Sequence, residues 1–236
     1  MRSALIMGEK AIETLNKKRV AVFGLGGVGG SAAEALARAG IGEFDLIDDD
    51  CFSLSNLNRQ CLCTLPDVGK AKVDVAEARI LSINESAIIH KHRCFFLPEN
   101  QGDLDFSLLD YAVDAIDTMS GKLAIIKAAQ KFNVPIISAL GCGNRLDPSQ
   151  LVLGDIFETQ GDPLARVLRR ELRKNGIKKL KVVYSKEAPR ALCGTLDEPL
   201  PPGKKTIPGS SPFVPPAAGI LLAYAVVKDL TDFGED

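Results

Sequence analysis

"VAVFGLGGVGG", Val20 to Gly30, decides the fold of this chain. A short β-branched run leads directly into glycines, and the helix-forming stretch "SAAEALARAG" follows at once. Glycines at this spacing allow a tight turn and let a phosphate approach backbone N–H groups, provided that a strand precedes them and a helix follows. The stretch therefore predicts a nucleotide-binding turn, with these candidate cofactor-binding residues: Gly24, Gly26, Gly27 and Gly29.

Strands and helices alternate through the first half of the chain. The predicted strands are Arg19–Phe23, Phe44–Ile47, Tyr111–Ile116 and Val134–Ala139. The predicted helices after the glycine turn are Gly69–Ile83 and Gly121–Phe132. This alternation is typical of a parallel sheet covered on both faces, so we expect an α/β fold with a Rossmann-like, doubly wound sheet.

The second half of the chain has a different pattern. "LVLGDIF" and Lys181–Tyr184 read as strands on either side of a basic helix, and Ala217–Leu230 reads as a buried helix. These elements should continue the sheet with mixed strand directions. We expect a single adenylation domain over residues 1–236, with an ATP-binding half over about 18–143 and a substrate-binding half over about 144–236.

Composition excludes several classes of protein. The net charge of −1 gives no global field for a nucleic acid or a membrane, so any basic footprint must be local. No signal sequence opens the chain, and the nearly apolar run Val214–Val227 holds two prolines and is too short to cross a bilayer. Six cysteines without a C-x-x-C pair indicate reduced thiols rather than a zinc site. We expect a cytoplasmic protein with no membrane partner.

The stretch "DDDCFSLSNLNRQ", Asp48 to Gln60, follows the second predicted strand. Asp48 comes nineteen residues after Gly29, where a carboxylate can accept both ribose hydroxyls of a bound nucleotide. These features alone leave a dinucleotide and ATP equally open.

Polar residues beyond Asp48 favour ATP. Asn56 and Arg59 lie in the loop after the second strand, Lys72 lies near the start of the next helix, and Asp117 follows the third predicted strand. Loops at the carboxyl ends of parallel strands meet at one edge of the sheet. When a carboxylate attacks the α-phosphorus of ATP, positioned cations and a magnesium ion stabilise the growing negative charge. A nicotinamide enzyme has no such need at this place.

Four motifs carry a resemblance to a known family. "GLGGVG", "DDDxxxxSNLNRQ", "VGKAKV" and "DAIDT" resemble the adenylation domain of the ubiquitin-activating enzymes and of their bacterial relatives in molybdopterin and thiamine sulfur transfer. The resemblance runs from about Arg19 to Gly143. It implies ATP and Mg²⁺ as cofactors and Arg59, Lys72 and Asp117 as catalytic residues.

The resemblance also implies a role for each polar residue. Asp48 would bind ribose, Asn56, Arg59 and Lys72 would contact phosphates, and Asp117 would hold the metal. Asp50 and Asp114 are weaker candidates that fit a supporting or structural role better, and Asp50 is kept among the cofactor-binding residues. Members of the family bring an arginine from the neighbouring subunit, which makes Arg2 the trans-subunit candidate and implies a homodimer.

Three later segments resemble one branch of this family, the tRNA threonylcarbamoyladenosine dehydratases: "DPLARVLRRELR", "VVYSKE" and "GSSPFVPPAAGILLA". The branch implies that ATP adenylates the threonyl carboxylate of threonylcarbamoyladenosine in tRNA. A nitrogen of the carbamoyl group then displaces AMP, which leaves a hydantoin- or oxazolone-type ring. Ser185, Ser210 and Ser211 stand where branch members can carry cysteines, which disfavours a covalent enzyme intermediate.

A basic helix is the predicted tRNA contact. Residues 166–181 hold eight basic residues against one acid. At helical spacing, four arginines share one face: Arg166, Arg169, Arg170 and Arg173. Four apolar residues should lie opposite: Leu164, Val167, Leu168 and Leu172. The alternative is a merely solvated face; the functional interpretation is a phosphate-backbone footprint.

Three other functions remain as alternatives. The first is activation of a sulfur-carrier protein's carboxyl terminus, which sulfur-transfer partners would accompany; nothing around Cys193 marks an activated thiol for a thioester step. The second is a nucleotide-binding module without turnover, and a nicotinamide-dependent dehydrogenase is a distant third. The proline- and glycine-rich segment 187–216 is predicted to form a lid.

Overall fold

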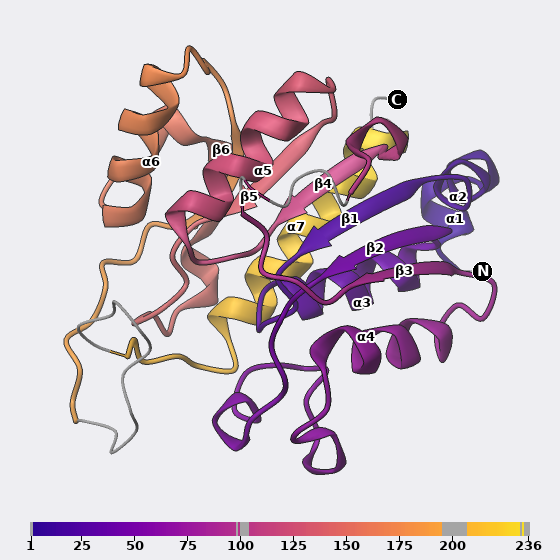
Figure 1. Cartoon of the computed structure of the whole chain (residues 1–236), viewed down its shortest axis with the longest axis horizontal. Coiled ribbons are helices and arrows are strands. Elements are labelled where there is room, and N and C mark those ends of the chain that lie inside the picture. The colour runs from indigo at the N-terminus through magenta and orange to yellow at the C-terminus, as the bar shows by residue number, and fades with distance from the viewer. Residues whose placement is uncertain (1, 98, 100–103, 195–206, 232, 234–236) are drawn as a thin grey trace.

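The computed structural model describes residues 2–97, 99, 104–194, 207–231 and 233. A seven-stranded sheet runs through the molecule in the order β3-β2-β1-β4-β5-β7-β6 (Figure 1). The strands are β1 (Arg19–Phe23), β2 (Glu43–Ile47), β3 (Ile88–His92), β4 (Tyr111–Asp114), β5 (Ile136–Ala139), β6 (Leu151–Asp155) and β7 (Lys181–Ser185). All neighbouring pairs are parallel except β6 with β7, which confirms the predicted doubly wound sheet with mixed strands in its second half.

Helices cover both faces of the sheet. They are α1 (Ala4–Met7), α2 (Glu9–Leu15), α3 (Gly29–Ala39), α4 (Lys72–Leu81), α5 (Met119–Lys131), α6 (Pro163–Lys174) and α7 (Val214–Thr231). Side chains that alternate along β1 enter different cores. Val20 and Val22 pack with α3, α4 and α7, whereas Ala21 and Phe23 pack beneath α5. A third apolar cluster joins α6 to β7.

Helix α7 is longer than its sequence pattern suggested. It begins at Val214 rather than Ala217, because prolines are tolerated in the first turn of a helix, where N–H groups have no partner in any case. Its 18 residues, with a mean hydropathy of 1.3, could cross a membrane by length and composition alone, but half of that stretch is buried in the fold. It packs against α3 and against strands β5, β6 and β7, as a core helix does.

The sequence pattern missed one strand. β3 lies at the sheet edge and carries two histidines and a lysine, so it lacks the apolar run that marks the inner strands. Asp117 therefore follows the fourth strand rather than the third, and that strand ends at Asp114 rather than Ile116. Likewise, the helix predicted from Gly69 begins at Lys72. Residues 195–206 of the predicted lid lie outside the described residues.

The order of the strands indicates which edge of the sheet binds a ligand. β1 lies between β2 and β4, and the chain leaves it toward opposite sides of the sheet, first to β2 and later to β4. In a doubly wound sheet, the loops part at such a reversal and leave a crevice beyond the carboxyl ends of the strands. The glycine turn, the loop after β2 and the loop after β4 all begin at this crevice.

An ion cluster around a buried carboxylate connects the three strands at one side of the sheet, β1, β2 and β3. Asp45 on β2 is fully buried and accepts hydrogen bonds from Arg19 Nε (2.7 Å) and His92 Nε2 (2.8 Å). Burial alone would raise the pKa of the Asp45 carboxyl, but His92 and Arg19 together hold that pKa below its ordinary value. The ionised carboxylate therefore stabilises the folded state.

Asp45→Asn should lower the free energy of unfolding at pH 7 by about 3 kcal/mol, because one partner of a buried pair is removed. Since folding lowers the pKa of Asp45, its stabilisation is present above the unfolded pKa of about 3.9 and is lost as pH falls through the folded value. Urea unfolding from pH 7 down to pH 3 should show the wild-type advantage shrinking. Glu13→Gln, on the exposed face of α2, is the control, and a pH-independent gap would contradict the account.

Candidate functional site

The crevice beyond β1, β2, β4 and β5 opens into a cavity of about 630 Å³. Its walls come from both halves of the chain, including the glycine turn on one side and the segments 141–145 and 162–164 on the other. A smaller cavity of about 400 Å³ adjoins it and shares Asp50, Arg59, Lys72 and Asp117 with it. The two together are large enough for a nucleotide and part of a second reactant.

Glycine stands at the positions of this turn for different structural reasons. Gly24 has φ +85°, and a Cβ there would lie 3.0 Å from Ala115 O. A Cβ on Gly29 would lie 1.7 Å from Gly24 O, so only glycine fits. At Gly26 the nearest atom to a Cβ would be Gln60 Nε2 at 3.9 Å. Gly26 is thus not required for packing; it leaves its backbone open to the cavity.

Asp48 connects three segments at the carboxyl end of β2. Its carboxylate accepts hydrogen bonds from Leu25 N in the glycine turn (2.6 Å) and from Asp50 N (2.9 Å). Lys72, at the first position of α4, lies 3.5 Å from Asp48 and 2.7 Å from Asp50. Burial raises the pKa of the Asp48 carboxyl, and Lys72 opposes that rise. The structure therefore brings Asp48, Asp50 and Lys72 together.

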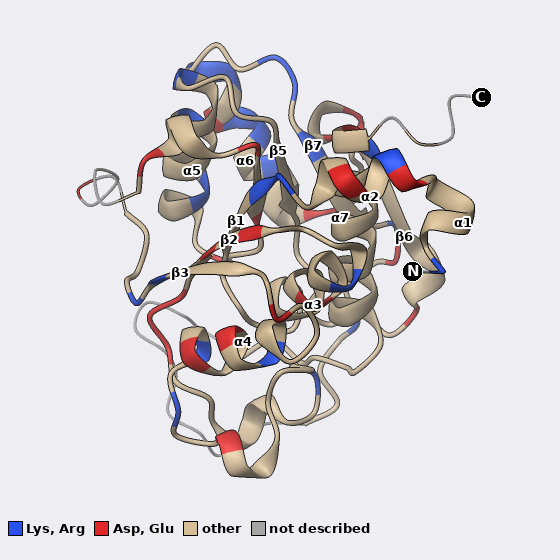
Figure 2. Cartoon of the chain, turned by 90° about the vertical axis from the view of Figure 1, so that its right-hand side faces the viewer, with Lys and Arg blue, Asp and Glu red and all other residues tan. Residues whose placement is uncertain are grey.

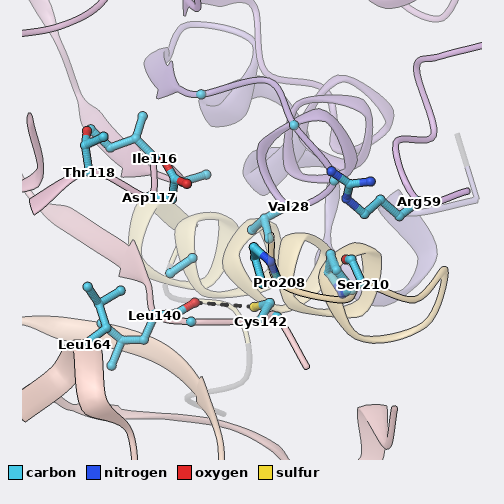
Figure 3. Close-up of a pocket in the computed structure, with 18 of the residues that line it drawn as sticks. Val28, Arg59, Ile116, Asp117, Thr118, Leu140, Cys142, Leu164, Pro208 and Ser210 are labelled. Carbon is cyan, nitrogen blue, oxygen red and sulfur yellow. Dashed lines mark hydrogen bonds between the residues drawn. The ribbon is translucent and has the colours of Figure 1, made fainter. Parts of the chain in front are cut away.

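Arg59 borders both cavities, and its loop fixes its orientation. Its Nη1 donates to Ser55 O (2.8 Å) and to Asn58 Oδ1 (2.9 Å). Asn58 also donates to Ser210 O (3.0 Å), so it ties Arg59 to the second half of the chain. Figure 3 shows Arg59 and Asp117 on different sides of the pocket, with Val28 between them.

Asn56 has a structural role that the sequence did not predict. Its side-chain oxygen accepts from Ser53 N, and Ser53 accepts in return, which closes a capping box around a short 3-10 turn. Asn56 lines only the smaller cavity. The pair explains why serine and asparagine stand three residues apart in this loop.

Two acidic groups near the cavity differ in role. Asp117 is exposed and lines both cavities. Asp114 is fully buried and pairs with Lys122 at 3.0 Å, and Lys122 also donates to Ala139 O. Asp114 therefore joins the ends of β4 and β5, in agreement with its predicted structural role.

Asp117 fits the oxygen-donor preference of Mg²⁺, which takes one or two carboxylates together with phosphate oxygens and water. Among the described residues, the acids close enough to share an ion are instead Asp48, Asp49 and Asp50, and Lys72 already pairs with two of them. Asp117 is not part of that group.

Among the described residues, Cys142 is the thiol that the second-half wall contributes to the cavity, and Cys94 lines it from the first half of the chain. Cys142 is buried, and burial raises its pKa to about 11, so it is protonated at neutral pH. Its Sγ contacts Leu140 O, as the dashed line in Figure 3 marks. Cys193 is exposed and does not line the cavity. Cys142 is therefore not activated as a nucleophile.

The sequence profile of the ThiF family matches residues 1–190. The chain belongs to the ThiF family. A tRNA threonylcarbamoyladenosine dehydratase of Bacillus subtilis is 39% identical, over 97% of this chain and 93% of the relative. The E. coli tRNA N6-threonylcarbamoyladenosine dehydratase has crystal structures with AMP and with ATP. The chain in the ATP complex is 31% identical in sequence to this one and superposes with a TM-score of 0.85. The match covers 98% of this chain and 93% of the E. coli chain.

Another ThiF-family relative has a different role. The sulfur carrier protein ThiS adenylyltransferase of E. coli is 35% identical, over 57% of this chain and 54% of the relative. The similarity to the dehydratases therefore covers a much larger share of this ThiF-family chain.

Helix α6 of this ThiF-family chain only partly matches its predicted pattern. Arg166, Arg170 and Arg173 are exposed, and Figure 2 shows basic residues gathered along this helix. Arg169 instead turns inward, and its guanidinium donates to Thr159 O at 2.9 Å. Val167 is exposed rather than packed, so the apolar face consists of Ala165, Leu168 and Leu172. The basic surface is therefore narrower than predicted.

Arg2 does not reach the cavity of its own chain. It is exposed beside α1, which lies near the amino ends of the strands, whereas the cavity lies at their carboxyl ends (Figure 1). Any contact between Arg2 and a site of this kind would have to come from a neighbouring chain.

Sequence reasoning missed three cavity residues. Gln60 is buried, and its Oε1 has no hydrogen-bond partner in the described part of the chain. Arg145 and Asp162 form a buried ion pair at 3.0 Å on the far wall. Gln60 directly follows Arg59, so the motif itself could have indicated it, but no local signal indicates that Arg145 meets Asp162, because 17 positions separate them.

Two glycine substitutions should distinguish a glycine that the packing of the turn requires from one that only leaves its backbone open to the cavity. Gly29→Ala should lower the melting temperature sharply, since its Cβ would overlap a backbone oxygen. Gly26→Ala should melt close to wild type, because its Cβ meets only open space and a distant side chain. Thermal unfolding of both variants, followed by circular dichroism, checks this; equal decreases would contradict it.

Proposed function

We propose that this protein is an ATP-dependent, carboxylate-adenylating, ligase-type enzyme that dehydrates threonylcarbamoyladenosine in tRNA to a cyclic product, releasing AMP and pyrophosphate. The observation that carries the proposal is the extent of its similarity to the dehydratases, which spans 97% of the chain. One cavity joining both halves gives the reaction a site. Residues 18–143 form the ATP-binding half of a single domain, and residues 144–236 form the substrate-binding half.

The glycine turn and Asp48 bind the nucleotide. Gly24 and Gly29 shape the turn, Gly26 and Gly27 present backbone N–H groups to phosphates, and Asp48 accepts the ribose hydroxyls. Lys72 reaches the phosphates when ATP displaces it from Asp50, and Asn56 contacts them from the smaller cavity. Asp50 holds Lys72 in place at 2.7 Å until then.

The threonyl carboxylate attacks the α-phosphorus of ATP, forming an acyl-adenylate as pyrophosphate leaves. A nucleophilic atom of the carbamoyl group then attacks the acyl carbon, closes the ring and expels AMP. Arg59 and Lys72 stabilise the negative charge that develops at the phosphorus. Cys142 is protonated and Cys193 does not line the cavity, which suits direct cyclisation of the adenylate without a covalent intermediate on either residue.

Asp117 would hold a magnesium ion against the triphosphate. When bound, the ion would neutralise charge on the phosphate oxygens. Asp117 lies on the other side of the cavity from Arg59, so the metal and the guanidinium would act on the phosphates from different sides (Figure 3).

The exposed arginines of α6 contact the tRNA backbone. A chain of net charge −1 that places Arg166, Arg170 and Arg173 on one short helix offers a local, salt-sensitive footprint for phosphate. The enzyme acts in the cytoplasm as a homodimer, and Arg2 enters the neighbouring subunit's site. Sulfur-transfer proteins are a further class of partner, by analogy with relatives that serve sulfur carriers.

Activation of a sulfur-carrier tail is the second candidate, because the ThiS adenylyltransferase shares about half of this chain. Incubation with ATP, magnesium and tRNA bearing threonylcarbamoyladenosine, followed by nucleoside mass spectrometry, decides between the two. The proposal expects loss of one water from that nucleoside, with AMP formed in step. No mass change, together with pyrophosphate exchange that depends on a diglycine-tailed carrier, would favour the second candidate; no exchange with either substrate would indicate a non-catalytic nucleotide-binding module.

Arg59→Ala should slow AMP formation by about 3 kcal/mol of activation free energy, as for removal of one preorganised charge-stabilising donor. Lys70→Ala is the control, since Lys70 is a basic residue of the same loop region that pairs with Asp67 and lines neither cavity. Steady-state rates of AMP release measure the effect. Release of AMP at the wild-type rate by the Arg59 variant would contradict the assignment of Arg59 as a charge-stabilising residue.

Changing Arg166, Arg170 and Arg173 to glutamine should weaken tRNA binding and lower the salt slope of log K by roughly 0.7–0.9 for each phosphate that the helix no longer neutralises. ATP affinity should stay unchanged, because none of the three lines the cavity. Filter binding across a salt series measures this. A variant lacking the exposed Lys17 and Lys228 instead should keep the wild-type slope; an unchanged slope in the arginine variant would leave α6 as a solvated face.

A further inference from the structure

Arg145 is buried where four segments of the second half meet. Its side chain is 3% exposed and is held by acceptors on three of them. Nη1 donates to Gly141 O, and Nε donates to Glu187 O at 3.0 Å. Nη2 donates to Asp162 Oδ2 at 3.0 Å. The donors of a guanidinium lie in one plane, so Arg145 fixes both the distance and the direction of the acceptors that it binds.

The backbone around Arg145 binds the fourth segment. Arg145 O accepts from Ser211 Oγ at 3.2 Å. The preceding residue, Asn144, has φ +58° and exchanges two 2.7 Å hydrogen bonds with Gly209. Asn144 O also accepts from Arg190 N. The segments around 141–145, 187–190 and 208–211 thus form one unit on the far wall of the cavity.

Asp162 connects this unit to α6. One carboxylate oxygen accepts a hydrogen bond from Ala165 N at 2.9 Å and so caps the helix. The other accepts from Arg145 Nη2. The next two residues, Pro163 and Leu164, line the cavity. At 1.5 Å per residue, the exposed arginines of α6 lie within about 17 Å of Asp162 along the helix axis. One end of this helix is therefore cavity wall, and the rest is basic surface.

We propose that Arg145 and Asp162 act as a positioning pair. They hold the substrate half of the cavity in a fixed position relative to α6, so that the modified nucleotide of a tRNA bound on α6 meets the ATP site. This rests on the proposed function. Neither residue reaches the reacting atoms; both act through the wall that they hold. The pair should govern the use of the tRNA-borne carboxylate and leave nucleotide binding, on the opposite wall, unaffected.

The test compares Arg145→Met, Arg145→Lys and Asp162→Asn in the full-length protein. Asparagine is as good a helix cap as aspartate, so Asp162→Asn removes the charge and keeps the cap. Asp155→Asn is the matched control, because Asp155 also caps a short turn but lies outside the cavity. Three quantities are measured: the affinity for ATP by calorimetry, the melting temperature, and kcat and KM for modified tRNA from AMP release.

Arg145→Met and Asp162→Asn should each lower kcat/KM for tRNA by about 100-fold, the effect of a small misplacement of reactants, and ATP affinity should stay close to wild type. Arg145→Lys should recover part of the activity, since it restores the charge without the planar set of donors. The double variant Arg145→Met/Asp162→Asn should be impaired far less than the sum of the two, because both act on one interaction. It also leaves no unpaired buried charge, so it is the variant to use if a single one fails to fold.

Two results would overturn the inference while wild-type turnover stands. One is turnover of tRNA at the wild-type rate by folded variants. The other is a parallel fall of melting temperature, ATP affinity and turnover, which would mean that the pair only supports the fold. A wild-type protein that forms no AMP from modified tRNA would instead refute the proposed function and the inference with it.

Discussion

The buried carboxylate of Asp48 is the constraint on which the site depends. It directly follows β2, accepts the Leu25 N–H of the glycine turn at 2.6 Å and lies 3.5 Å from Lys72 at the start of α4. Because a desolvated carboxylate is costly without partners, these contacts must form together. A single charge thus aligns the turn, the loop after β2 and the next helix around the crevice of the doubly wound sheet.

The second half of the chain completes the cavity rather than forming a separate lobe. β7 adds to the sheet beside β5, α7 packs against the helix that follows the glycine turn, and a Cβ on Gly27 would lie 3.1 Å from Pro215. Asn58 links Arg59 to Ser210 across the two halves. Two hydrogen bonds in series therefore connect Ser210, in the second half of the chain, to Arg59 at the cavity.

Periodicity and motif spacing predicted most of the fold because the inner strands are apolar and the helices regular. The same signals failed at β3, whose polar edge residues owe their strand conformation to pairing with β2. They also did not reveal that the Asn56 side chain caps its own turn, and they failed at Arg169, which turns inward to Thr159. Spacing along a helix does not reveal a partner elsewhere in the chain, so the Arg145–Asp162 ion pair could be found only from the structure.

Isotope transfer would report whether the proposed acyl-adenylate forms at this cavity. Modified tRNA would carry ¹⁸O in both oxygens of the threonyl carboxylate and react in a single turnover with unlabelled ATP. If that carboxylate attacks the α-phosphorus and AMP leaves during ring closure, each AMP must carry one heavy oxygen. AMP without the label, beside a ring that has closed, would show that the carboxylate was activated by another route and would contradict the account.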